Sequence, residues 1–317
     1  MFDIKLLEQL CLCNGISGDE GNVRNLIINE IKDSADDIKT DNLGNLIVFK
    51  KGKKSAKSKL MVSAHMDEVG LMVTDITSDG YLKFDEVGGI DRRVLPGKRV
   101  CVGKNRLSGV IGVKPIHLTS GDEKTAVPKM SDMYIDIGAE SREDALKYVN
   151  YGDSVNFEGD FKINGKTVVT KALDDRFGCY VLINLIKSEP EYDMYFTFVV
   201  QEEVGLRGAR PAAFTVNPDF ALVIESTTAA DVAEVDVSHQ VCNLSKGATV
   251  TVMDRATVYD KEMISAAFEL AEKNNINVQY KRAVAGGNDS GAIHQSRGGV
   301  RTLGVSLPSR YIHAPST

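Results

Sequence analysis

The chain has 317 residues, 43% of them hydrophobic and 26% charged, with a formal net charge of −6 at pH 7. Such a mildly acidic chain has no electrostatic reason to bind nucleic acid or an anionic membrane, so we expect neither as a partner. The sequence has no apolar run long enough to span a bilayer, and its N-terminus lacks the basic and apolar regions of a secretory signal.

The cysteine content indicates a reducing compartment. The chain has five cysteines, an odd number, and most lie in apolar surroundings, which favours buried thiols over disulfides. Cys11 and Cys13 are close together, but no second cluster follows at the spacing of a structural zinc site. We therefore expect a cytoplasmic protein.

The first predicted elements are two helices and a buried strand. Leu6, Leu7 and Leu10 give an apolar stripe of roughly helical period. Ser17 and Glu20 have the form of a capping box, which predicts the start of a second helix. The apolar run at 60–64 predicts a strand that is buried on both faces.

The middle of the chain has a different pattern. From about residue 71 to 168, short alternating strands separated by turn residues predict a small, mostly β insert, in which Ser141–Tyr148 is the clearest helix. After it, helices and strands alternate, which predicts an α/β fold with a largely parallel sheet. We therefore divide the chain into a discontinuous α/β domain, residues 1–68 and 167–317, and an inserted β domain, residues 69–166. The later predicted elements are helices at Phe177–Ile186 and Lys261–Asn274 and strands at Met194–Val200, Phe220–Ile224 and Val300–Leu307.

Acids and histidines follow the strands of the α/β domain. Ligands of open α/β sheets collect at the carboxyl ends of the strands. Each acid or histidine alone has an ordinary explanation, such as a helix N-cap or a solvated strand exit. Together they crowd like charges onto one edge, which is costly unless a metal neutralises them. The residues concerned are His65, Asp67, Asp174, Asp175, Glu202, Glu203, Glu225 and His313.

The ligand types predict the kind of metal. Imidazole and carboxylate without cysteine suit zinc, cobalt or manganese. A bridging carboxylate holds two such ions about 3.5–4 Å apart in two-metal hydrolases. Successive side chains of a strand point to opposite sides, so one of Glu202 and Glu203 can bind metal while the other acts as a general base.

Three other functions are compatible with these residues. A related dimetal amidohydrolase would act on N-acyl amino acids and need no free amine. A glycan hydrolase needs two carboxyl groups that face each other across a sugar. Glu202 and Glu203, pointing apart, do not form such a pair, but other acids on the same edge could. A non-catalytic oligomeric scaffold would retain the fold without the chemistry.

Four segments of the chain resemble the M42 family of metallo-aminopeptidases. The family includes glutamyl aminopeptidases and tetrahedral (TET) aminopeptidases, and some members have been labelled endoglucanases. The resemblance extends in order over nearly the whole chain. The four segments are Ala64–Gly70, Ala172–Arg176, Gln201–Ala209 and Tyr311–His313.

The resemblance implies an aminopeptidase that removes N-terminal residues from peptides with two divalent metal ions, zinc or cobalt first and manganese next. It implies that His65 and Glu225 both bind the first metal ion and that Glu203 and His313 both bind the second. Asp174 would bridge the two ions. Many family members have Asp where this chain has Glu225.

The same resemblance assigns Glu202 as the base and Asp67 as the residue that orients His65, and it implies a cis peptide bond between Asp174 and Asp175. It implies a zinc-exopeptidase-like α/β/α catalytic domain with an inserted small β-barrel, a PDZ-like domain that serves oligomerisation and substrate access. It also implies a homo-oligomer such as a dodecamer. Family members continue into a closing helix after the last motif, so we expect further residues beyond Thr317.

Overall fold

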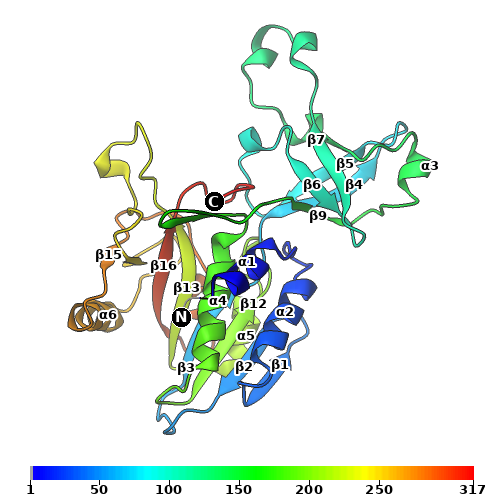
Figure 1. Ribbon diagram of the computed structural model, residues 1–317. Coiled ribbons are helices and arrows are strands. Elements are labelled where there is room, and N and C mark those ends of the chain that lie inside the picture. The colour runs from blue at the N-terminus through cyan, green and yellow to red at the C-terminus, as the bar shows by residue number, and fades with distance from the viewer. Residues whose placement is uncertain (1–2) are drawn as a thin grey trace.

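Residues 3–317 are described by a computed structural model, in which an eight-stranded sheet with helices on both faces lies beside a separate closed barrel (Figure 1). The helices are α1 (Ile4–Leu12), α2 (Gly21–Ile31), α3 (Arg142–Ala145), α4 (Leu173–Lys187), α5 (Ala209–Val216), α6 (Lys261–Lys273) and α7 (Ser290–Ile293). The predicted α/β class is confirmed.

The sheet has parallel strands at its centre and antiparallel neighbours on both sides. In spatial order its strands are β1 (Asp37–Thr40), β2 (Leu46–Lys50), β12 (Met194–Val199), β3 (Leu60–His65), β13 (Phe220–Thr228), β16 (Arg301–Ser309), β14 (Ala248–Val250) and β15 (Val278–Tyr280). The four strands β12, β3, β13 and β16 run parallel to one another. Their carboxyl ends therefore meet at one edge of the sheet.

Helices cover both faces of this central part. α1, α2 and α4 pack their apolar side chains on one face, and α5 and α7 pack on the other. The predicted stripe of Leu6, Leu7 and Leu10 is buried on α1, as a helical period requires. Burial on both faces explains why β3 reads as a continuous apolar run rather than an alternating one.

The barrel has a hydrophobic core of its own. Its strands, in order around the barrel, are β4 (Gly70–Ile76), β5 (Leu82–Val87), β8 (Tyr134–Asp136), β7 (Leu107–Gly112), β6 (Arg99–Val102) and β9 (Ser154–Phe157). The short strands predicted here are confirmed. The helix predicted at Ser141–Tyr148 is shorter, because α3 ends at Ala145; Ser141 accepts a hydrogen bond from the amide of Asp144 and caps its start.

An arm between β7 and β8 was not predicted. It holds the 3₁₀ helices η2 (Ile116–Leu118), η3 (Gly121–Lys124) and η4 (Met130–Asp132) and rises away from the barrel (Figure 1). Ile116 is 67% exposed and Leu118 60% exposed. The remaining elements are the 3₁₀ helices η1 (Arg92–Val94) and η5 (Val237–His239) and the hairpin of β10 (Lys162–Asn164) and β11 (Thr167–Val169).

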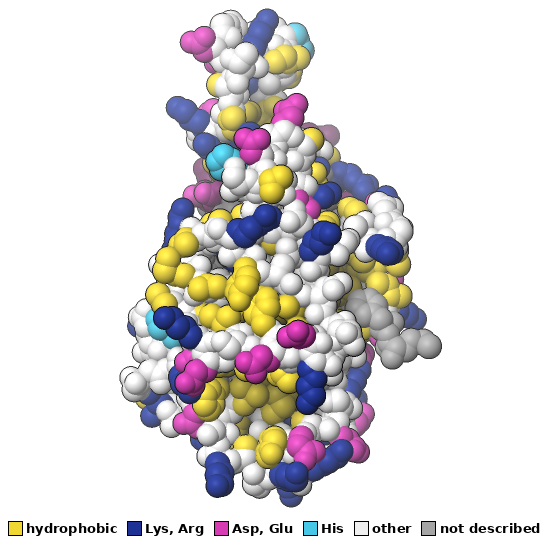
Figure 2. Space-filling model, turned by 90° about the vertical axis from the view of Figure 1, so that its left-hand side faces the viewer, with side chains coloured by type: hydrophobic (Ala, Val, Ile, Leu, Met, Phe, Trp, Pro, Cys, Tyr) yellow, Lys and Arg dark blue, Asp and Glu magenta, His cyan; other side chains and the backbone are white. Residues whose placement is uncertain are grey.

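The surface carries an apolar groove of about 700 Å³ between α4 and β16. Phe177 and Val181 line it from α4, and Val305 and Leu307 line it from β16. Figure 2 shows hydrophobic side chains gathered in the middle of the face that it draws. Among residues 3–317, no helix is long and apolar enough to cross a membrane.

Arg176 of α4 is fully buried and joins the N-terminal segment to the end of β3. Its guanidinium donates to four backbone carbonyl oxygens, those of Leu10 (2.5 Å), Cys13 (2.7 Å), Gly15 (3.2 Å) and Met66 (2.8 Å). These carbonyl groups lie at a helix end and in loops, and only that of Gly15 also accepts a backbone amide, from Glu68. One side chain therefore satisfies acceptors on two separate segments.

Glu68 and Lys171 complete this buried network. The Lys171 ammonium donates to both carboxylate oxygens of Glu68, at 2.6 and 2.8 Å, and the Arg176 guanidinium lies 3.4 Å from the same carboxylate. Glu68 belongs to the segment that leads into the barrel and Lys171 to the segment that returns from it. The ion network thus joins both connections between sheet and barrel.

We predict that Arg176→Met lowers the free energy of unfolding by about 3–5 kcal/mol, because it removes one of the two cationic partners of the buried Glu68 carboxylate and the donor that the carbonyl groups of Leu10, Cys13 and Met66 share. Chemical denaturation measures the change. Arg93→Met is the matched control, since the Arg93 side chain is 73% exposed and its pair with Asp91 lies in solvent; it should cost less than about 0.5 kcal/mol. Equal costs for the two variants would contradict the prediction.

Candidate active site

The edge where the parallel strands end collects the predicted site residues. His65 is the last residue of β3, Glu202 and Glu203 follow β12, and His313 lies beyond β16. Glu225 was predicted at the end of its strand, but β13 continues to Thr228 because its parallel pairing with β16 extends that far. The glutamate therefore projects from within a strand.

Two histidines converge on one aspartate from different sides. His65 Nε2 lies 3.5 Å from Asp174 Oδ1 and 3.4 Å from Glu225 Oε1. His313 Nε2 lies 3.6 Å from Asp174 Oδ2 and 3.3 Å from Glu203 Oε2. Each oxygen of Asp174 thus belongs to a separate group of three possible ligands, and the ligand atoms in each group lie within 4.8 Å of one another.

The burial of these atoms fits a metal site. His65 Nε2, Asp174 Oδ1 and Glu225 Oε2 are enclosed, yet none has a hydrogen-bond partner. Leaving a buried polar atom without a partner costs about 1–3 kcal/mol, so three such atoms on neighbouring side chains are expected where a cation can supply the missing partner. Imidazole and carboxylate are ligands of zinc, cobalt and manganese.

The start of α4 gives Asp174 its position. The peptide bond between Asp174 and Asp175 is cis, as expected, and neither residue has helical backbone angles. The Asp175 carboxylate accepts hydrogen bonds from the amides of His65 (3.3 Å) and Gly178 (2.9 Å). The end of β3 and the start of α4 are therefore tied together beneath the site.

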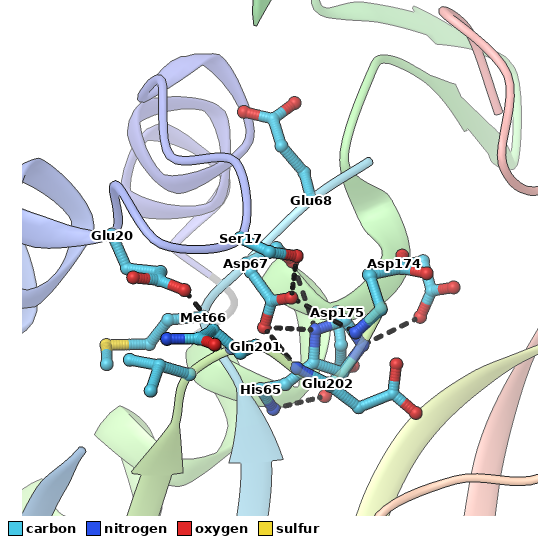
Figure 3. Close-up of polar contacts among 12 residues, drawn as sticks. Ser17, Glu20, His65, Met66, Asp67, Glu68, Asp174, Asp175, Gln201 and Glu202 are labelled. Atoms are coloured by element: carbon cyan, nitrogen blue, oxygen red, sulfur yellow. Dashed lines mark hydrogen bonds and ion pairs between the residues drawn. The ribbon is translucent and has the colours of Figure 1, made fainter. Parts of the chain in front are cut away.

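Asp67 contacts several groups besides His65. The His65 ring nitrogen Nδ1 is 3.0 Å from the backbone oxygen of Asp67 and 3.5 Å from its carboxylate. The carboxylate accepts hydrogen bonds from the amides of Glu202 (3.0 Å) and Glu203 (3.1 Å) and from the Ser17 hydroxyl (2.6 Å). Figure 3 shows these contacts around the labelled carboxylate. Asp67 thus links the histidine to the backbone of the two glutamates.

The capping box predicted at Ser17 and Glu20 is wrong. Glu20 is the N-cap residue of α2, but no side chain caps that helix. The Ser17 hydroxyl donates to Asp67, and the Glu20 carboxylate accepts from the amides of Gly18 and Gln201. Both side chains are buried and directed toward the site, because the loop between α1 and α2 folds over the end of β12.

The electrostatics of the site follow from crowded acids in a dry environment. Burial, followed by the charge of Asp174, raises the pKa of Glu203 to about 7. Burial and contact with Asp174 likewise raise the pKa of Glu225 to about 7, although its contact with His65 lowers it. Burial and neighbouring acids also raise the pKa of Glu202 well above its usual range. Contact with Asp174 raises the pKa of His313 to about 9. For His65, contacts with acids outweigh burial and raise the pKa.

Asp289 is an acid that the sequence did not single out. It is 1% exposed, and neither oxygen of its carboxylate has a hydrogen-bond partner. Its charge acts on Glu202, and the adjoining Gly291 approaches Leu206 so closely that an added Cβ would lie 3.3 Å from that side chain. The segment at 286–291 therefore packs against the turn that carries Glu202.

Comparison with known proteins identifies the family. A model of the M42 glutamyl aminopeptidase family matches residues 44–317. The chain belongs to the M42 peptidase family. A putative aminopeptidase of Acetivibrio thermocellus is 44% identical to this M42 peptidase over 99% of the chain and 92% of its own length.

Solved structures agree with this assignment. A TET aminopeptidase from a marine sediment archaeon of the Thaumarchaeota superposes with a TM-score of 0.94 at 33% identity, over 99% of this chain and 90% of its own. The TET1 peptidase of Pyrococcus horikoshii, which can assemble into a tetrahedron or a large octahedral shell, superposes with a TM-score of 0.86 at 40% identity over 99% and 93%. This M42 peptidase shares their mixed α/β fold with a closed barrel.

Family membership makes the chain a peptide hydrolase, as the motifs predicted. Peptidases of the M42 family depend on metal, and the histidines and acids described above form groups that can bind it.

We predict that the metal-free protein loses stability as the pH rises from 5 to 9. The pKa of Glu203 and of Glu225 is about 7 in the folded protein, against 4.5 for the ordinary group. The free energy of unfolding therefore falls as the pH rises from 4.5 to 7, because the folded protein resists losing these protons. His313, raised from 6.5 to about 9, contributes stability below 6.5 that is lost as the pH rises through 9. The glutamates and His313 therefore both lower the free energy of unfolding as the pH rises.

Calorimetry after chelation should show a Tm at pH 8.5 that is lower than at pH 5.5 by at least about 3 °C. Zinc or cobalt added at pH 8.5 should raise the Tm again, because a bound cation stabilises the ionised acids. The double variant Glu203→Gln, Glu225→Gln should flatten the pH dependence. A Tm that stays constant or rises over this range would contradict the assignment of these groups.

Proposed function

We propose that this chain is a dinuclear metal aminopeptidase that removes N-terminal residues from peptides. His65, Glu225 and one oxygen of Asp174 would hold one divalent ion, and His313, Glu203 and the other oxygen of Asp174 would hold the second. The observation that carries the proposal is the convergence of both histidines on separate oxygens of one buried aspartate. Zinc and cobalt suit this ligand set best, and manganese is the next candidate.

Glu202 is the proposed general base. When bound, the metal ions polarise the peptide carbonyl and make water a stronger nucleophile. The Glu202 carboxylate accepts a proton from the attacking water and then donates it to the nitrogen of the departing amine. A raised pKa makes the Glu202 carboxylate a stronger base for the first of these two steps.

The barrel supports a second part of the proposal. We place the α/β catalytic domain at residues 1–68 and 167–317 and a PDZ-like β domain at residues 69–166, which serves self-association and access of peptides. Its exposed arm, with Ile116 and Leu118 in solvent, is consistent with such a contact surface. We place the protein in the cytoplasm, where its free thiols stay reduced.

We predict that Glu202→Gln lowers kcat on aminoacyl anilides by at least about 1000-fold, because the amide cannot take up the proton. Elemental analysis should still find two metal ions per chain. Glu203→Ala and His65→Ala should instead reduce the metal content. Glu269→Gln on the exposed side of α6 is the control and should behave as wild type.

The substrate panel for this experiment pairs each aminoacyl anilide with its N-acetylated form and includes cellulose. Cleavage of the free-amine compounds alone supports an aminopeptidase. Preference for the acetylated forms would replace it with the amidohydrolase alternative, and release of reducing sugar would indicate a glycan hydrolase. Full activity of the Glu202→Gln variant would remove Glu202 from the base role.

We predict that the protein sediments as a homo-oligomer, up to a dodecamer, at micromolar concentration. The related TET1 peptidase of Pyrococcus horikoshii assembles into closed shells, and this chain has exposed apolar side chains on the arm. Sedimentation velocity measures the mass. The variant Ile116→Ser, Leu118→Ser should shift it toward smaller species, and a wild-type monomer would refute the prediction.

A further inference from the structure

The turn that carries Glu202 has a backbone that the local sequence does not favour. Gln201 precedes the glutamate with a φ of +56°, in the left-handed region. For a residue other than glycine this conformation costs roughly 1–2 kcal/mol. Contacts from elsewhere in the chain must therefore hold the turn in place.

Four successive backbone amides of this turn each donate to a side chain from a distant segment. The Val200 amide donates to Asn45 (2.9 Å), the Gln201 amide to Glu20 (3.1 Å), and the amides of Glu202 and Glu203 to Asp67 (3.0 and 3.1 Å). An ordinary turn satisfies such groups with backbone carbonyls. Here the path of the turn is set by three side chains that lie outside it.

Glu20 differs from the other two acceptors, Asp67 and Asn45, in the groups that it contacts. Asp67 also contacts His65, and Asn45 also binds the Gly208 carbonyl within the same loop. Glu20 is 4% exposed, and its Oε1 atom accepts from both Gln201 and Gly18 (2.7 Å). Figure 3 shows it approaching the turn from the side opposite Asp174. Within residues 3–317, Glu20 forms no hydrogen bond or ion pair with a proposed metal ligand.

We propose that Glu20 is a positioning residue for the reaction. By holding the Gln201 amide it fixes the backbone immediately before Glu202, and with it the direction in which the Glu202 carboxylate points. The inference rests on the proposed role of Glu202 as the base. A single oxygen makes both contacts, so the function requires a hydrogen-bond acceptor of glutamate length rather than a negative charge.

The test compares three substitutions at Glu20 with a matched control. Glu20→Gln retains an oxygen at the same reach and should keep kcat within about twofold of wild type. Glu20→Met removes the acceptor, and Glu20→Asp is one methylene too short; both should lower kcat by about 10–100-fold while KM changes less than about threefold, because the base is misdirected and substrate binding is not. Glu30→Met on α2, which loses only its surface pair with Lys187, should leave both constants unchanged.

Two further measurements separate positioning from general damage. Metal content should be equal in all variants, and amide hydrogen exchange in the segment 200–203 should be faster in Glu20→Met than in Glu20→Gln. Equal exchange in the two variants, or a Glu20→Gln variant as impaired as Glu20→Met, would overturn the proposal.

The activity of the Glu202→Gln variant shows whether a negative result concerns the role of Glu20 or the proposed function itself. If Glu202→Gln stays active, Glu202 is not the base, and the Glu20 proposal falls with it. If Glu202→Gln is inactive but Glu20→Met turns over like wild type, the base assignment holds and the positioning role is refuted. The exchange measurement needs no turnover, so it tests the contact even in protein without activity.

Discussion

The buried ion network of Glu68, Lys171 and Arg176 is the constraint on which the rest of the structure depends. The chain leaves the sheet at Met66–Val69 and returns at Lys171, and the network ties these two crossings to each other and to the loop after α1. A buried charge without its partner costs several kcal/mol, so few other arrangements of the three segments are tolerated. His65, Asp67 and Asp174 lie within four residues of the network, and their separation is fixed by the same contacts.

Next to this network, the site brings together buried acids, which would repel one another if all were ionised. The raised pKa values of Glu203 and Glu225 show that the folded chain resists ionising them, whereas hydrolysis near neutral pH requires ionised ligands. In the proposed function a cation would resolve the conflict, because it would stabilise the ionised carboxylates and supply a partner for the enclosed atoms of His65 and Asp174. On this proposal, the stability and the chemistry of the site would depend on the same ions.

The outer contacts of the site come from segments far apart in sequence. Ser17 and Glu20 from the loop after α1, Asn45 from the turn before β2 and Asp67 from the end of β3 all bind the turn after β12 or a residue that holds it. Such contacts fix the direction of a side chain more firmly than a flexible turn would. They explain why a residue with unfavourable backbone angles, Gln201, is kept next to the proposed base.

The sequence by itself determined the α/β class, the β insert, the main strands and the set of acids and histidines at the strand ends, because apolar periodicity and residue type are local properties. The pairing of His65 and His313 with separate oxygens of Asp174 depends on three chain segments meeting, so the motifs implied it only through family resemblance. Tertiary structure alone decided where Ser17 and Glu20 point. Their spacing is that of a helix cap, but hydrogen bonding to Asp67 and Gln201 across the fold replaces the local bond. It also decided that Glu225 lies inside a strand, that Asp289 is buried beside the site, and that an exposed arm rises between β7 and β8, since long-range packing sets all three.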